Sequence, residues 1–311
     1  MNIDNREEVL SYFEKISNTL ISYAVKFEAK KKGKNILVVG ATHGNEKVGV
    51  ETAIDYIEKF KNSQLILESG SLSFLISNPN AFLENKRYIE RDMNRSFFEN
   101  LEGKFFFEAK RINEIKTFLD ENHFDILIDL HSVSRGDFKI LVYNAQDERI
   151  EKFLEDIACL DLHFLYKDEH IPNTLMQEAF RRGILSFAIE CGNHNSNDAF
   201  LVAKEQIDAI LIKFNMINEY NLNFQKKVFS FKKYETIDKI KVGNNFNFLI
   251  ENLETETFLK KDMILSFDDD NGHQVIKEDC YVFENSEYGY VRFLENFIDP
   301  IFIYKDDKIV F

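Results

Sequence analysis

Asn35-Ile36-Leu37-Val38-Val39-Gly40 is the stretch of sequence that decides the fold. A short apolar run of this kind is typical of a strand that is buried on both faces, as in a parallel sheet. The next segment, 48–60, spaces its apolar residues along one face of a helix. The alternation continues, with strands predicted at 72–76, 125–130 and 185–189 and helices at 108–121 and 173–182. We therefore predict an α/β fold with a mainly parallel central sheet flanked by helices.

The pattern changes after about residue 215. From Lys226 onward, short runs rich in Val, Ile, Phe and Tyr are separated by turn-forming stretches at 243–245, 268–272 and 286–289. Such spacing is typical of antiparallel strands joined by tight turns. The sequence thus predicts two domains, an α/β domain over 1–215 and a smaller β-rich domain over 216–311. At the other end of the chain, residues 7–30 show a broken helical periodicity.

Composition and charge exclude several classes of protein. Of the 311 residues, 44% are hydrophobic, which is a globular value and excludes wholesale disorder. The 39 basic and 53 acidic side chains give a net charge of −14 (39 − 53). This balance argues against a nucleic-acid partner and against a polybasic protein of the membrane surface. No apolar run approaches the ~18–20 residues that a membrane-spanning helix needs.

The cysteines and the N-terminal residues bear on the compartment. Cys159, Cys191 and Cys280 are widely spaced and form no Cys-x-x-Cys pair, which fits a reducing compartment. Residues 1–16 are acidic and lack the apolar stretch of a secretory signal. We therefore predict a cytoplasmic protein. The sequence leaves its oligomeric state open, a homo-oligomer included.

The first candidate for chemistry is the pair His43 and Glu46, which follows the strand predicted at 35–40. A turn that contains Gly44 separates this strand from the next helix. A His and a carboxylate three residues apart can bring a nitrogen and an oxygen to one point, as two ligands of a zinc ion require. Short His-x-x-Glu pairs also arise by chance, and a glycine-containing turn with a helix-capping His is the other interpretation.

A second histidine ends another predicted strand. His131 follows the buried run 125–130 and can complete a His/Glu/His triad that leaves a fourth position of zinc open. Asp129, two residues earlier, is placed to accept a hydrogen bond from a liganding imidazole or to cap local backbone. Taken alone, a His at the end of a strand is more often structural.

Two further groups complete the candidates. Arg87, Arg91, Asn94 and Arg95 lie within nine residues, shortly after the strand predicted at 72–76. Arginine forks bind carboxylates bidentately, although a charged loop is most often simply solvated. Glu190 closes the apolar run 185–189, where a buried carboxylate is costly unless it is paired or functional. Beside a metal ion, such a carboxylate has the properties of a general base.

The order and spacing of these groups resemble the succinylglutamate desuccinylase/aspartoacylase family, which belongs with the zinc-carboxypeptidase fold. The most specific stretch runs from Asn78-Pro79 through Arg87-Tyr88 to Asp92-Met93-Asn94-Arg95. Thr42-His43-Gly44-Asn45-Glu46 and Asp129-Leu130-His131 are almost as specific. The resemblance covers residues 35–195 clearly, and the remaining chain only in its general character.

The resemblance implies a zinc-dependent amidohydrolase, a deacylase that cleaves the amide bond of a small acidic N-acyl amino acid. One Zn²⁺ per chain would be held by His43, Glu46 and His131. A zinc-bound water would attack the amide with Glu190 as general base, while Arg87 polarises the scissile carbonyl. Asn94 and Arg95 match the pair that binds the carboxylate of the amino-acid product.

Specificity is less closely defined by the resemblance. Arg135 is similar to an arginine of the desuccinylase branch and would bind a second carboxylate or face solvent. Arg181 and Arg182 lie in the region where aspartoacylases place such an arginine, although the register needs a gap. Cys191-Gly192 stands where aspartoacylases tend to carry Gly-Pro after the base. The acyl group and the amino acid therefore stay open.

Two alternatives remain at this point. A zinc carboxypeptidase that trims a peptide or a cell-wall fragment would use the same metal ligands and the same base. A non-catalytic binding protein that retains the fold is the second alternative.

Four of the remaining histidines are predicted to be surface or loop residues, namely His123, His163, His170 and His273. His194 is a weaker candidate for lining the site. The 268–272 run is predicted to be a turn and not a calcium loop.

Overall fold

The computed structural model describes most of the chain. The described residues are 1–99, 101, 103–133, 139–144, 147, 149–150, 153, 162–166, 173–218, 231–240, 243–250, 257–277, 279–282 and 301–310.

Four parallel strands form the centre of the sheet, as the apolar runs predict. They are β2 (Asn35–Gly40), β3 (Ser71–Ile76), β4 (Ile126–Val133) and β7 (Leu185–Asn193). β2 lies between β3 and β4, and β4 lies between β2 and β7. Within β2, Val38 packs into the core on one face of the sheet and Leu37 and Val39 into the core on the other. This two-sided burial is the reason why the strand reads as a continuous apolar run.

The complete sheet is mixed, which corrects the prediction of a mainly parallel one. β1 (Ala24–Glu28) pairs antiparallel with β3 at one edge, and β5 (Lys139–Asn144) pairs antiparallel with β7. β6 (Leu162–Tyr166) then pairs parallel with β5. The helical pattern of 7–30 corresponds to a helix over only part of its length. α1 (Arg6–Ile16) ends where Ser17 N–H bonds to the carbonyl of Phe13, and β1 follows.

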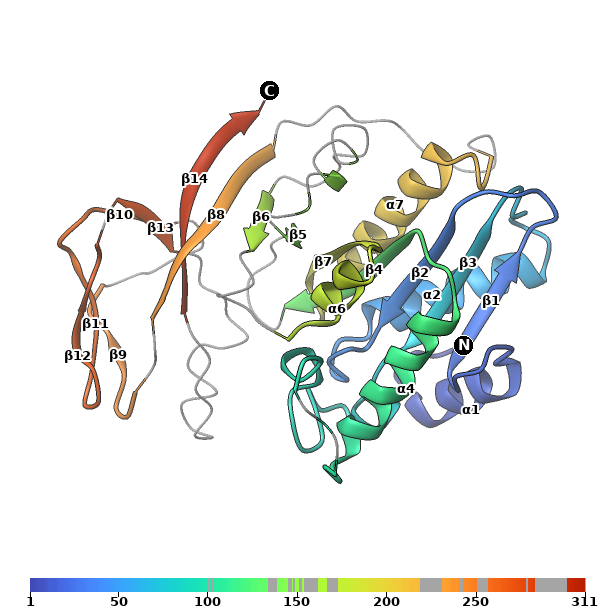
Figure 1. Cartoon of the computed structure of the whole chain (residues 1–311), viewed down its shortest axis with the longest axis horizontal. Coiled ribbons are helices and arrows are strands. Elements are labelled where there is room, and N and C mark those ends of the chain that lie inside the picture. The colour runs from blue at the N-terminus through green and yellow to red at the C-terminus, as the bar shows by residue number, and fades with distance from the viewer. Residues whose placement is uncertain are drawn as a thin grey trace.

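Helices cover both faces of the sheet (Figure 1). One face carries α1, α2 (Val48–Lys61) and α7 (Asn197–Lys213), whose apolar residues join a core with Val38 and Leu130. The other face carries α4 (Phe107–Glu121) and α6 (Leu175–Arg181), which pack over Leu37 and Leu127. Two short elements, α3 (Pro79–Leu83) and the 3-10 helix η1 (Met93–Arg95), follow β3. Among the described residues, none of the helices combines the length and apolar character needed to cross a membrane.

The C-terminal part of the chain is rich in strands, as its turn pattern predicts. β8 (Phe231–Ile240), β14 (Ile301–Val310), β13 (Cys280–Val282) and β10 (Thr257–Leu259) extend the sheet beyond β6 (Figure 1). β8 pairs with β6, so the sheet is continuous across the position predicted to divide the two domains. That division stays a prediction.

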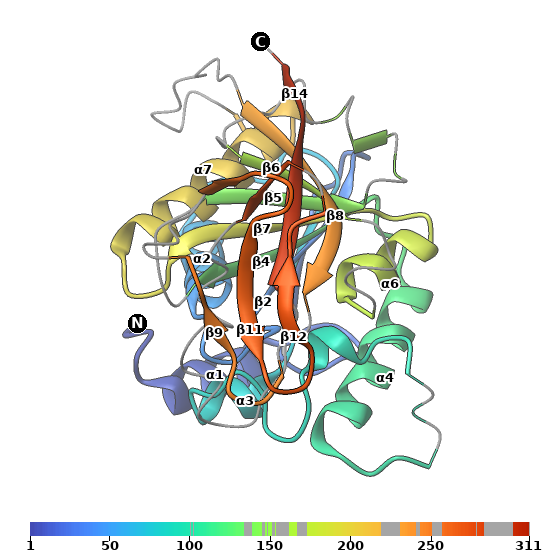
Figure 2. The same ribbon diagram turned by 90° about the vertical axis from the view of Figure 1, so that its left-hand side faces the viewer.

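A separate small sheet contains β9 (Asn247–Phe248), β11 (Ile264–Asp268) and β12 (Gly272–Val275) (Figure 2). The turn predicted at 268–272 joins β11 to β12. The carboxylate of Asp268 accepts hydrogen bonds from the backbone N–H groups of Asp270 and Asn271, and Gly272 has a φ of 69°.

Candidate metal centre and active site

The turn after β2 brings His43 and Glu46 together. Glu46 N–H bonds to the carbonyl of His43, which closes the turn just before α2 begins. His43 Nδ1 then lies 2.6 Å from Glu46 Oε1. Gly44 lets this turn pass close to α3, since a Cβ at this position would lie 2.0 Å from the carbonyl carbon of Ala81. The glycine therefore serves a close approach of two backbone segments.

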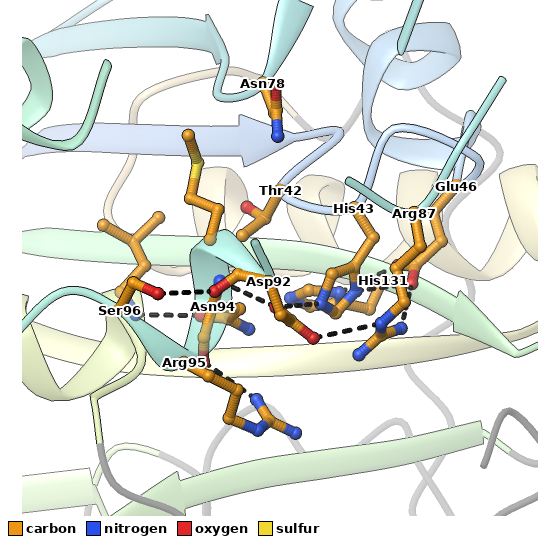
Figure 3. A network of polar contacts seen from close by, with 12 residues as sticks. Thr42, His43, Glu46, Asn78, Arg87, Asp92, Asn94, Arg95, Ser96 and His131 are labelled. Carbon is orange, nitrogen blue, oxygen red and sulfur yellow. Dashed lines mark hydrogen bonds and ion pairs between the residues drawn. The ribbon is translucent and has the colours of Figure 1, made fainter. Parts of the chain in front are cut away.

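His131 reaches the same carboxylate from β4. Successive residues of a strand point to opposite faces, so Asp129 and His131 share one face and Leu130 lies in the core of the other. His131 Nδ1 is 2.8 Å from Glu46 Oε2. Ligand atoms of His43, Glu46 and His131 all lie within 4.8 Å of one another, and the three side chains are buried. We call these three residues the metal centre (Figure 3).

Two further carboxylates face the outer nitrogens of the imidazoles. Asp92 Oδ1 lies 3.3 Å from His43 Nε2, and Asp129 Oδ2 lies 2.9 Å from His131 Nε2. Thr42 Oγ1 donates to the other oxygen of Asp129 at 2.8 Å. Carboxylates in this position fix the orientation of liganding imidazoles. Of the two roles predicted for Asp129, the structure shows the contact with an imidazole, that of His131.

Burial and mutual attraction shift the ionisation of these groups in opposite directions. Burial alone favours the neutral acid, but the imidazoles of His43 and His131 outweigh it and hold the pKa of Glu46 well below its usual range. Burial likewise opposes charge on His131. The carboxylates of Asp129 and Glu46 outweigh this effect and raise the pKa of His131 well above its usual range. The cluster therefore stabilises positive charge at its centre.

The donor set fits a divalent cation. Three buried carboxylates, from Glu46, Asp92 and Asp129, lie in the cluster with the guanidinium of Arg87. When both imidazoles are neutral, these four groups carry a net charge of −2 (1 − 3). Two imidazole nitrogens and one carboxylate oxygen form a ligand set that zinc uses in catalytic sites, with a further position left for water or substrate. His43, Glu46 and His131 therefore could hold zinc.

Two of the arginines predicted to contact substrate, Arg87 and Arg95, lie on residues 87–95, which we call the arginine loop. Arg87 Nε bonds to Asp92 Oδ2 at 3.1 Å, and Arg87 Nη1 is 3.5 Å from Glu46 Oε1. The backbone carbonyl of Arg87 accepts from Gly44 N–H at 3.0 Å. Burial would raise the pKa of Asp92, but Arg87 and His43 outweigh it and lower that pKa well below its usual range. Arg87 is thus held beside the metal centre.

The second half of the arginine loop forms η1. Asp92 Oδ1 accepts from the backbone N–H of Asn94, and Asn94 Oδ1 accepts from the N–H of Leu175 at the start of α6. Arg95 Nη1 bonds to the carbonyl of Asn94, and the Arg95 side chain extends away from the two imidazoles (Figure 3). Asn94 is buried and Arg95 is partly exposed. Of the two side chains, Arg95 is therefore the one that lies toward the outside of the cluster.

Glu190 stands next to His131 on the neighbouring strand. The two residues are partners in the parallel register of β4 and β7. Since Ile189 and Cys191 pack into the core with α7, strand alternation puts Glu190 on the same face as His131. The register then shifts before Asn193, at a bulge where Gly192 has a φ of 103°. Bulges of this kind redirect side chains beside active sites.

Other predicted residues have different surroundings. Arg135, together with His170 and the side chain of His163, lies outside the described residues. Arg182 bonds to Asp120 and Glu178, and Arg181 stacks 3.6 Å over the ring of Phe98, so both are engaged at the C-terminal end of α6. The α6 N-terminus, and not this end, contacts Asn94.

Two of the remaining histidines lie at the surface, as predicted. His123 and His273 are exposed. His194 Nδ1 lies 3.4 Å from Ser132 Oγ, one residue from His131. Cys191 is fully buried, and burial together with Glu190 raises the pKa of its thiol well above the usual value, which disfavours a nucleophilic thiolate.

Two functional features escaped the sequence analysis. Asp92 was seen only as part of a motif, whereas it contacts both His43 and Arg87. Its position five residues after Arg87 is the signal that could have found it. Glu108, in the first turn of α4, was not considered at all, although it is buried against the arginine loop.

The comparison with known families agrees with this geometry. The family model for the succinylglutamate desuccinylase/aspartoacylase catalytic domain matches residues 32–211, which is more than half of the chain. The chain belongs to this family. The match includes every residue of the metal centre and of the arginine loop.

Individual relatives and solved structures extend the comparison. A probable aspartoacylase of Trichodesmium erythraeum is 27% identical over 261 residues, which cover 76% of this chain and 86% of that protein. An N-acyl-aromatic-L-amino acid amidohydrolase (carboxylate-forming) of Xenopus tropicalis is 37% identical over 106 residues, 32% of this chain and 34% of that protein. Several other curated relatives are matched over 34% to 49% of their length.

Among solved structures, succinylglutamate desuccinylase from Vibrio cholerae superimposes with a TM-score of 0.70 at 15% identity. The superposition covers 92% of this chain and 88% of that one. At this identity the likeness concerns the fold. It confirms the α/β architecture that the sequence predicts for this family.

Proposed function

We propose that this protein is a zinc-dependent amidohydrolase that removes the acyl group from a small N-acyl amino acid. The observation that carries the proposal is the convergence of His43, Glu46 and His131 beside Arg87, with Glu190 on the strand next to His131. Membership of the family and the printed functions of its relatives support a hydrolase of the deacylase type.

Zinc would be held by His43, Glu46 and His131. When bound, zinc supplies Lewis acidity, which polarises a carbonyl group and lowers the pKa of water to about 7. The fit rests on the two Nδ1 atoms and the carboxylate that meet in the buried metal centre.

Glu190 is proposed to move the proton. Its carboxylate would take a proton from the attacking water and deliver it to the nitrogen of the departing amine. Arg87 would donate a hydrogen bond to the scissile carbonyl oxygen as negative charge develops there. Asp92 holds the Arg87 guanidinium at 3.1 Å, so this donor is oriented before substrate arrives.

Asn94 and Arg95 are proposed to bind the carboxylate of the amino-acid part. Asn94 Oδ1 already accepts from Leu175, so the Nδ2 group of this side chain would be the donor. Arg95 would supply the charge. We also propose that Arg135 binds a second carboxylate of an acidic substrate. A cytoplasmic location is part of the proposal and rests on the wide spacing of the cysteines, of which Cys191 and Cys280 are buried.

The first experiment is amine release by the zinc-loaded protein. The panel would contain N-acetylaspartate, N-succinylglutamate, N-formyl and N-acetyl aromatic amino acids, and peptides with a free C-terminus. Glu190→Gln serves as the inactive control, because it should retain zinc and lose about 10²–10⁴-fold in turnover. Hydrolysis confined to acidic N-acyl amino acids supports the proposal in full. A preference for aromatic ones would change the proposed substrate to an N-acyl aromatic amino acid.

Three outcomes would contradict all or part of the proposal. Cleavage of peptides alone would make the protein a carboxypeptidase. No turnover in any arm, with zinc bound at one ion per chain, would leave a binding protein that retains the fold. Loss of zinc from Glu190→Gln in step with activity would remove Glu190 from the role of base.

A further inference from the structure

The arginine loop is bonded to a buried carboxylate that the proposed reaction does not use. Glu108 lies in the first turn of α4 and is 1% exposed. Its Oε1 accepts from the backbone N–H of Ile89 at 2.7 Å, and its Oε2 accepts from those of Glu90 and Arg91, both at 3.3 Å. Asn78 Nδ2 lies 3.4 Å from the same Oε1. One side chain thus binds three consecutive N–H groups of the loop.

A second carboxylate makes the contact reciprocal. Glu90 Oε2 accepts from the backbone N–H of Phe107, the first residue of α4, at 2.7 Å. This N–H group has no acceptor within its own helix, because the first turn of a helix leaves its donors unpaired. The loop therefore supplies an acceptor for a backbone N–H of the helix, and the helix supplies acceptors for three backbone N–H groups of the loop.

A carboxylate suits this position better than an amide would. It has two oxygens that only accept hydrogen bonds, whereas a glutamine side chain presents one oxygen and two donor hydrogens. Backbone N–H groups that bond to an ionised acceptor make stronger hydrogen bonds than they make to a neutral one. Glu108 thus accepts from three N–H groups of residues 89–91, which stand between Arg87 and Asp92.

We propose that Glu108 is a positioning residue for the reaction. By fixing residues 89–91, it sets where the two ends of the arginine loop stand: Arg87 beside Glu46 at one end, and Asn94 and Arg95 at the other. The effect of Glu108 on the reaction rests on the proposed function. The ordering of the arginine loop by Glu108 does not depend on the proposed function.

Glu108→Gln tests the proposal with little change in side-chain volume. We expect amide hydrogen exchange at residues 89–91 to become about tenfold faster while exchange in the central strands stays as in the wild type. For the zinc-loaded enzyme, kcat/KM should fall about ten- to a hundredfold, since a displacement of ~1 Å in a positioning group costs on the order of a hundredfold. Zinc stoichiometry should be unchanged, because the metal centre is carried by other elements.

The matched control is Asp208→Asn. Asp208 is also a buried helical carboxylate, but it lies on α7, on the opposite face of the sheet, where it binds the hydroxyl of Tyr56 and pairs with Lys204. This variant should lower the Tm and leave both kcat/KM and exchange at 89–91 unchanged. If it lowers kcat/KM as much as Glu108→Gln at a similar loss of Tm, Glu108 is merely structural and the proposal is overturned.

A second variant keeps the test usable if Glu108→Gln does not fold. Glu90→Ala removes the exposed partner of Phe107 N–H and should lower kcat/KM about two- to tenfold in the same direction. Unchanged exchange at 89–91 in Glu108→Gln, or faster exchange with unchanged kcat/KM, overturns the proposal. If the wild type hydrolyses nothing in the panel, the proposed function fails, and exchange alone then decides whether Glu108 orders the loop.

Discussion

The metal centre and the arginine loop meet at the C-terminal ends of the central parallel strands, yet they are held there in different ways. His131 stands on β4, whose pairing with β2 and β7 sets its position, and His43 and Glu46 follow directly from β2. The arginine loop instead runs through bends and the 3-10 helix η1, and its N–H groups are satisfied by the carboxylates of Glu108 and Asp92. Apart from Asp92, which contacts both, residues of the two regions should therefore have separate effects when mutated.

The largest expected effect comes from breaking the metal centre. His131→Ala removes one of two imidazole donors, so zinc content should fall well below one ion per chain and amide hydrolysis should fall to background. Atomic absorption on dialysed protein measures the metal. His123→Ala, an exposed histidine shortly before β4, is the control and should keep full zinc. One zinc per chain in His131→Ala would exclude this residue as a ligand.

Asp92→Asn should affect both regions at once, because Asp92 contacts His43 and Arg87. We expect zinc affinity, measured by competition with a chelator, to fall about 10–100-fold. KM should rise, because Asp92 also accepts from the backbone N–H of Asn94, which is proposed to bind the substrate carboxylate. Asp120→Asn removes an exposed carboxylate that bonds to Arg182 and should change neither quantity. A change in KM with unaltered zinc affinity would show that Asp92 serves the arginine loop alone.

Arg95→Ala should act on the arginine loop alone. Loss of a guanidinium that binds the substrate carboxylate should raise KM about tenfold or more and leave zinc content at the wild-type level. Steady-state kinetics with the best substrate of the panel measures this. Arg91→Ala is the control on the same loop, since Arg91 is exposed and pairs with Glu99. Equal KM values for the two variants would argue against a substrate contact by Arg95.

The smallest effect should appear at the opposite end of the sheet. Asp125 accepts from Lys34 Nζ at 2.9 Å and from Asn35 N–H at 2.8 Å. Burial would raise the pKa of Asp125, but these two partners outweigh it and lower that pKa in the folded protein. The stability that Asp125 contributes is thus present above its unfolded pKa of about 4 and is lost as the pH falls through its folded pKa.

Asp125→Ala should therefore lower the free energy of unfolding by about 1 kcal/mol at pH 7, with zinc content and KM unchanged. Chemical denaturation of the wild type and the variant at pH 7 and at pH 3 measures the difference. The gap between the two proteins should narrow at the lower pH. A constant gap would show that the charge of Asp125 contributes nothing.

Much of the framework could be predicted from the sequence. The strand predicted at 35–40 is β2 without a change of bounds, and the helices predicted at 48–60 and 108–121 differ from α2 and α4 by one residue at an end. Each of these elements buries apolar residues, and the spacing of those residues gives a clear pattern in the sequence. β1, β5, β6 and α7 were not predicted, and β1 is a short edge strand whose five residues carry little pattern.

The sequence by itself predicted that His43, His131 and Glu190 stand at one end of the sheet. Apolar runs favour buried parallel strands, and the C-terminal ends of parallel strands lie at the same end of a sheet, where ligands bind. Only the tertiary structure decided what holds the arginine loop. An acidic residue in the first turn of a helix is favoured there by the helix dipole whatever it touches. The pairing of Glu108 with residues 89–91 therefore becomes visible only when α4 is packed on the sheet.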